Sequence, residues 1–183
     1  MTTWALLAPG PSASAEQAER VRGLRLGVVG CAYQLAPWAD FVASTDSAWW
    51  RKYPEAKKLP GLKFAMHHVA GVTKVAIPRL GVCNSGVLAL ECAKRQGAKR
   101  ILLFGFDMHG SHFFGKYANG LSNTTDAKRA VHFRQYEAWR DANPQIEVIN
   151  CTAGSALRCF SMARADEIDS LLAVERRRER LSA

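Results

Sequence analysis

The chain has 183 residues, of which 48% are hydrophobic and 22% charged, and its formal net charge is +9 at pH 7. This length and composition predict one globular domain with its own core and exclude a disordered or disulfide-stapled chain. The basic surplus favours phosphate-bearing partners, namely nucleotides, nucleic acid or anionic lipid, without choosing among them.

Several classes of partner lack a signature in this sequence. No zinc-finger, RNP-type or helix-turn-helix pattern is present, so nucleic acid enters only as a partner that a basic surface could bind. No apolar run has the length of a signal sequence or membrane span, and the five cysteines contain no CxxC pair. We therefore expect a cytoplasmic protein with free thiols and no membrane association. The sequence is compatible with a homo-oligomer.

The first predicted unit is a strand over Trp4–Ala8, a tight turn, and a helix over about Ala13–Arg22. The turn contains Gly10, Pro11 and Ser12, and either Ser12 or Ser14 can cap the helix. A helix amino end directs N–H groups and a positive dipole at its surroundings, which suits a phosphate or carboxylate. The alternative is a plain strand-to-helix turn without a ligand.

The next predicted strands cover Leu26–Val29 and Phe41–Ser44. Gly30 follows the first, but the G-x-G-x-x-G spacing of a dinucleotide site is absent, so a nicotinamide cofactor is not expected. Asp46 follows the second, where it either caps a short helix or faces a site. Two more strands are expected over Lys63–Met66 and Thr73–Ile77.

The most informative stretch runs from Asn84 to Gly110. Asn84 or Ser85 can cap a helix over Ser85–Gln96, and a continuous apolar run predicts a buried parallel strand over Ile101–Phe104. Asp107 lies at the carboxyl end of that strand, which is the edge where open α/β sheets bind ligands. The alternative is one ordinary α/β unit of a core.

A long polar loop follows Asp107. Loops of this length in compact domains are usually functional or mobile. His109 and His112 lie in it, and histidine changes its charge near neutral pH, so both are candidates for proton transfer. We favour His112.

A helix is predicted from Thr125 or Asp126 to about Asp141. Its small residues, Ala127, Ala130, Val131 and Ala138, are expected to pack on the sheet. The other face carries His132, Tyr136 and Trp139, which we expect to cover another helix or form a dimer contact.

The remaining elements are a strand over Glu147–Ile149, a polar loop with Asn150, Thr152 and Ser155, and a helix over about Asp166–Val174. We expect a single nucleotide-binding domain over residues 1–174 and a solvated, charged tail over 175–183. The alternation of strands and helices predicts an α/β fold, with a Rossmann-like, mostly parallel sheet and helices on both faces.

Four segments in chain order resemble one family: LLAPGPS, SGVLALECAKRQGAKRILLFGFD, TTDAKRAVHF and VINCTAGSALRCF. They are similar to bacterial sialyltransferases, to hydroxymethylpterin pyrophosphokinases, and most closely to uncharacterised relatives carried by phages and prophages. The resemblance runs from Leu6 to about Phe160. It implies a cytidine nucleotide site formed by Gly10, Pro11, Ser12, Ser85, Gly86, Asn150, Thr152 and Ser155. We add Gly30 and Asp46 to the predicted nucleotide site, because each follows a predicted strand.

Two positions depart from the family pattern. Gly30 stands where an asparagine is usual, and Leu121 stands where sialyltransferases have their histidine base. His112 could have taken over that role. The Asp-x-Asp pair that holds a metal-bound diphosphate is also absent, so we expect no cofactor.

The resulting hypothesis is a glycosyltransferase-like enzyme with a nucleotide-sugar donor of the CMP type. His112 is expected to act as base, with Asp107 orienting it or the donor. One alternative is a nucleoside-triphosphate-dependent diphosphokinase of the pterin type, with Mg²⁺ on Asp46 and Asp107. The other is a nucleotide-binding protein that has lost catalysis.

Overall fold

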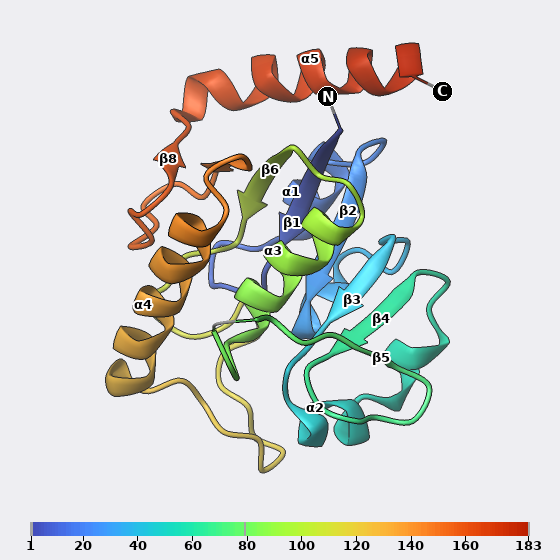
Figure 1. The fold of residues 1–183 in the computed structure, drawn as a ribbon, viewed down its shortest axis with the longest axis vertical. Coiled ribbons are helices and arrows are strands. Elements are labelled where there is room, and N and C mark those ends of the chain that lie inside the picture. Colours follow the sequence, from blue (N-terminus) through green and yellow to red (C-terminus); the bar gives the residue numbers. More distant parts are fainter. Residues whose placement is uncertain (1, 79, 183) are drawn as a thin grey trace.

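The computed structural model describes residues 2–78 and 80–182, within which eight strands form one sheet (Figure 1). Their order is β5-β4-β3-β2-β1-β6-β7-β8, and all neighbouring strands are parallel. The strands are β1 (Thr3–Leu7), β2 (Arg25–Val29), β3 (Phe41–Ala43), β4 (Leu62–Ala65), β5 (Thr73–Lys74), β6 (Arg100–Phe104), β7 (Glu147–Asn150) and β8 (Ser161–Met162). The predicted Rossmann-like α/β fold is confirmed, and the sheet is parallel throughout.

Helices cover both faces of the sheet. The α-helices are α1 (Ala15–Arg20), α2 (Ser47–Lys52), α3 (Ser85–Arg95), α4 (Asp126–Ala142) and α5 (Ala165–Ser182), and the short 3₁₀ helices are η1 (Gly30–Gln34) and η2 (Pro54–Lys58). One core cluster joins the sheet to α3 and α4, and a second joins it to α1, η1, α2 and α5. The fold therefore has three layers.

From Trp4 to Leu7 the sequence of β1 is apolar without interruption, because the strand is covered on both faces. All five of its residues are buried. Trp4 and Leu6 belong to the core under α3, whereas Ala5 and Leu7 belong to the core on the opposite face. Because successive side chains alternate between faces, a strand covered on both sides needs apolar residues at every position.

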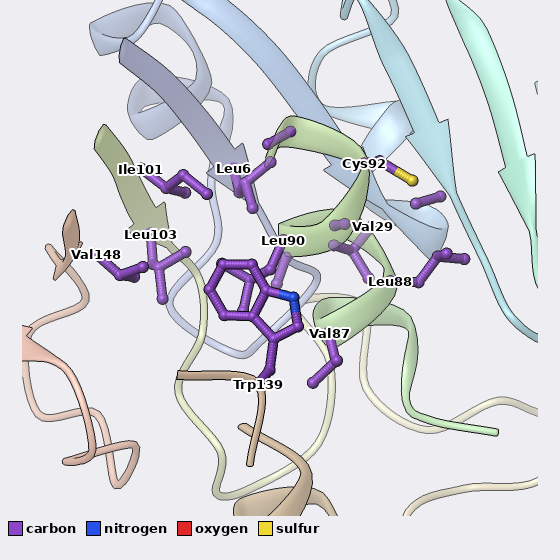
Figure 2. Close-up of a cluster of buried hydrophobic side chains, with 14 of the residues drawn as sticks. Leu6, Val29, Val87, Leu88, Leu90, Cys92, Ile101, Leu103, Trp139 and Val148 are labelled. Atoms are coloured by element: carbon purple, nitrogen blue, oxygen red, sulfur yellow. The ribbon is translucent and has the colours of Figure 1, made fainter. Parts of the chain in front are cut away.

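Helix α3 forms largely as its sequence predicts. The side chain of Asn84 accepts a hydrogen bond from Val87 N at 3.1 Å, and Gly97 has a φ of +89° just beyond the helix. Val87, Leu88 and Leu90 pack with strand residues in the cluster shown in Figure 2. The predicted span differs from the observed one by a single residue.

The prediction of the packing face of α4 is wrong. Its small residues, including Ala127, Ala130 and Val131, are exposed, whereas Tyr136 and Trp139 are buried. The Trp139 ring lies among aliphatic side chains of α3 and the sheet (Figure 2). Burying an aromatic ring removes far more apolar area from water than burying an alanine does, so the aromatic face of α4 packs against the core.

The predicted tail boundary at residue 174 is also wrong, because α5 continues to Ser182. Glu175 is buried and accepts hydrogen bonds from Thr3 Oγ1 and Arg100 Nη1, which connect α5 to β1 and β6. The prediction also missed β8, and it made β5 too long. No helix of the described residues is long and apolar enough to cross a membrane.

Candidate functional site

The sheet order reverses between β1 and β6. The chain steps outward from β1 to β5 and then returns to place β6 on the other side of β1. The loops after β1 and β6 meet there, because Ala8 N donates to Phe104 O at 2.8 Å and Gly10 N to Gly105 O at 3.0 Å. In open α/β sheets such a reversal is where ligands bind, outside the carboxyl ends of the strands.

A cavity of about 850 Å³ opens over the carboxyl ends of β1, β2, β3 and β6. Its size lies within the range of small-molecule sites. The 108–124 loop and the first turns of α4 form its other walls. Of the residues predicted for the site, the structure brings seven to this cavity: Gly10, Gly30, Asp46, Ser85, Gly86, Asp107 and His112.

Asp107 holds the β1 turn against the β6 loop. It is 2% exposed, and its Oδ2 accepts hydrogen bonds from Ser12 Oγ at 2.9 Å and Ser12 N at 3.4 Å. A Cβ at Gly10 would lie 2.0 Å from that same oxygen, so only glycine fits there. Ser12 thus binds a carboxylate. Ser14, the other candidate, caps α1. Pro11 is exposed and does not line the cavity.

Asn150, Thr152 and Ser155 lie behind the β6 loop and do not line the cavity. All three are 0% exposed. Thr152 Oγ1 accepts from Phe106 N at 3.0 Å, and Ser155 Oγ donates to Phe106 O at 2.6 Å. Asn150 donates to Ser155 Oγ at 3.0 Å. The structure therefore gives these residues a supporting position, in contrast to the ligand contact expected of them.

Gly30 and Asp46 mark the ends of β2 and β3 at the cavity. Gly30 has a φ of +48°, a conformation that glycine adopts without strain. Asp46 accepts a hydrogen bond from Ala48 N at 2.7 Å and so caps α2. Asp46 meets both expectations held for it, as a helix cap and as a residue facing the site.

The amino end of α3 opens onto the cavity next to β3. Ser85 Oγ accepts a hydrogen bond from Thr45 N at 3.0 Å, which fixes the helix start against the end of the strand. A helix leaves its first N–H groups without intrahelical acceptors. Asn84 accepts the hydrogen bonds of Val87 N and Leu88 N. Ser85 and Gly86 line the cavity, and their N–H groups have no acceptor within the described residues.

His112 lies half-buried in the 108–124 loop. Its ring stacks on that of Phe114, with 4.8 Å between the ring centroids, and lies near that of Tyr117, with 4.7 Å between the centroids. Its Nδ1 lies 3.3 Å from Gly115 O. A proton on Nδ1 makes that hydrogen bond and leaves Nε2 as an acceptor. Burial lowers the pKa of His112, and the weaker contact with Gly115 O acts in the opposite direction, so the ring is neutral at pH 7.

The two predicted catalytic residues are not joined to each other. The hydrogen bonds of the Asp107 side chain go to Ser12, and that of the His112 ring goes to Gly115. His109 lines the cavity but is exposed. Met108 has a φ of +58°, and no other non-glycine residue in the described part of the chain has a positive φ. The loop therefore starts in a strained conformation.

The charged residues of the cavity differ in their partners. The carboxylates of Asp46, Asp107 and Asp126 are each engaged, the last by Arg129. Lys116 and Lys128 also line the cavity, and within the described part of the chain neither forms an ion pair. The formal charges of these side chains and Arg129 sum to zero, so an anionic ligand would meet positive charge locally, at Lys116 and Lys128.

Sequence reasoning missed the wall that α4 contributes. Lys128, His132 and Tyr136 all line the cavity. Their spacing of four residues, which places side chains on one helix face, was the available signal. Burial lowers the pKa of His132, and the positive charges of Arg129 and Lys128 lower it further.

The arrangement can bind an anion at α3 and move a proton at His112. The described residues hold no group of three or more His, Cys, Asp or Glu side chains placed to share a metal ion. Asp46 and Asp107 are the carboxylates that line the sheet side of the cavity. Comparison of the chain with protein-family models, curated proteins and solved structures found no match.

Proposed function

We propose that this chain binds a CMP-type nucleotide sugar in the cavity and transfers the sugar to the hydroxyl group of an acceptor. The resemblance of four sequence segments to bacterial sialyltransferases supports the choice of donor. One structural observation carries the proposal: Ser85 and Gly86, at the start of α3, and His112, in the 108–124 loop, line the same cavity.

In the proposed reaction, Nε2 of His112 takes the proton of the acceptor hydroxyl. The acceptor oxygen then bonds to the anomeric carbon as the bond from that carbon to the donor phosphate breaks. The electron pair leaves with CMP, and the N–H groups of Ser85 and Gly86 stabilise its negative charge. Asp107 acts as a positioning residue, because it holds the β1 turn through Ser12.

The first test is a melting-temperature screen with CMP, UMP, AMP and ATP, the last with and without Mg²⁺. We expect CMP to give the largest increase in melting temperature, because a ligand that binds only the folded state stabilises it by mass action.

The second test measures CMP release from CMP-sugars in the presence of hydroxyl acceptors. His112→Ala should lower release about 100-fold, while the CMP-induced shift persists.

His68→Ala is the matched control, because His68 is exposed and lies outside the cavity. Its rate should equal that of the unmodified chain. The rate should also fall as the pH drops below the ordinary histidine value of 6.5, because protonated His112 cannot accept a proton and burial places its pKa below that value.

Three results would contradict the proposal. Unchanged release by His112→Ala would remove the histidine from the reaction. Loss of ATP with formation of AMP, dependent on Mg²⁺, would favour the diphosphokinase. A CMP-induced shift without turnover of any donor would favour a binding protein.

A further inference from the structure

Tyr136 is a buried residue that lines the cavity and has a polar side-chain group. The residue is 3% exposed, and its ring is held edge-on by Phe106 and Phe160, each with a centroid distance of 6.3 Å. Within the described part of the chain, its Oη forms no hydrogen bond, although the residue lines the cavity. The polar groups of buried side chains nearly always have a partner, so we expect this hydroxyl to donate to a ligand in the cavity that Tyr136 lines.

The hydroxyl faces the amino end of α3. A Cβ at Gly86 would lie 1.9 Å from Tyr136 Oη, so glycine alone leaves room there. Glycine is less favourable than alanine inside a helix, and here it lets the Tyr136 hydroxyl approach the helix backbone closely. Ser85 and Gly86 line the same cavity as Tyr136.

Helix α4 adds positive charge to this wall. Lys128 and His132 precede Tyr136 by two turns and one turn, and all three line the cavity. Lys128 is exposed and forms no ion pair within the described residues. Burial raises the pKa of Tyr136, so its hydroxyl keeps its proton and acts as a donor.

We propose that the amino end of α3 and the Lys128–His132–Tyr136 face of α4 together form a subsite for a phosphate group. The N–H groups of Ser85 and Gly86 and the Tyr136 hydroxyl donate to its oxygens, and Lys128 balances its charge. The identity of the ligand as a nucleoside monophosphate rests on the proposed function. The subsite itself requires only a phosphate.

The test compares binding of CMP, cytidine and inorganic pyrophosphate by calorimetry. Tyr136→Phe removes the hydroxyl and keeps the ring, and Lys128→Gln removes the charge. Each should weaken CMP and pyrophosphate binding about tenfold or more, with the cytidine affinity unchanged. Arg134→Gln is the matched control, since Arg134 is an exposed cation of the same helix that does not line the cavity.

Gly86→Ala provides a second, independent variant, because its methyl group would overlap the Tyr136 hydroxyl and displace it. It should lose CMP and pyrophosphate binding, and its circular dichroism spectrum should report whether the fold is retained. CMP binding that is equal in the unmodified chain and in Tyr136→Phe would overturn the subsite and leave the proposed function standing. Pyrophosphate binding that depends on Tyr136, without CMP binding, would support the subsite and contradict the proposed function. Binding of neither would overturn both.

Discussion

Glu91 is a buried carboxylate that connects α3 to α4. It is 3% exposed and forms ion pairs with Lys94 at 2.6 Å and Arg95 at 3.0 Å, and its Oε2 accepts from Trp139 Nε1 at 3.2 Å. Burial alone would raise the pKa of Glu91, but the hydrogen bonds from these three side chains together lower it. A single residue thus fixes how the wall formed by α4 sits on α3.

Replacing Glu91 by Leu should therefore lower the free energy of unfolding by about 2 to 3 kcal/mol, because the Trp139 N–H loses its acceptor inside the core. Glu91→Gln keeps an acceptor and should cost less. Urea unfolding at pH 7 measures both, with exposed Glu137→Gln as the control. Equal stability of the Leu variant and the unmodified chain would contradict the assigned role.

The same carboxylate gives stability a pH dependence. Because the pKa of Glu91 is lower in the folded chain than in the unfolded chain, its contribution is complete above the unfolded value of about 4.3. The contribution is lost as the pH falls through the folded pKa. Glu91→Gln should lack this component of acid destabilisation.

Among the elements, α5 adds a buried polar contact at its middle to the packing of Ile168 and Leu172 in the core. Glu175 is 0% exposed, and it reaches Thr3 on β1 and Arg100 on β6. Its neighbours Arg176 and Arg177 are more exposed. The contact ties the last helix to the centre of the sheet.

Glu175→Ala should cost about 2 to 3 kcal/mol, because it removes the buried pair with Arg100 and the acceptor of the buried Thr3 hydroxyl, while Arg100 keeps its ion pair with Glu147. Asp169→Ala is the control on the same helix. Its pair with Arg20 is exposed, and such pairs contribute about 1 kcal/mol or less. Thermal unfolding of the two variants decides the matter: similar losses would mean that burial of Glu175 has no special weight.

Elements set by local pattern were predictable, and those set by distant contacts were not. Asn84 caps α3 through a residue three positions away, and the sequence shows that directly. The role of Thr152 depends on Phe106, which lies 46 positions away, and that of Glu175 on Thr3, 172 positions away. The part of the candidate site at strand ends followed from sheet geometry, whereas the α4 wall required knowing which helix face is buried.

At the scale of the whole molecule, the thiols report on the integrity of the core. The five cysteines are free; Cys159 is partly exposed and the other four are buried. Burial raises the pKa of Cys83, Cys151 and Cys159, the last to about 11. Reactive thiolate is therefore scarce in the folded chain at neutral pH.

A thiol reagent at pH 7 should accordingly modify Cys159 first and the four buried thiols only as the chain unfolds. Mass spectrometry should show a single early adduct, then four more whose rate rises with urea. Rapid modification of all five without denaturant would mean that the core opens far more readily than its packing indicates.

The two outermost strands of the sheet, β5 and β8, are each two residues long. Such short edge strands present few unpaired backbone N–H and C=O groups to another chain, so the sheet offers little surface for strand pairing that leads to aggregation. Contacts between copies of this protein would then have to use helix surfaces. A concentrated solution of the folded chain should accordingly stay free of cross-β fibrils, which thioflavin fluorescence can monitor.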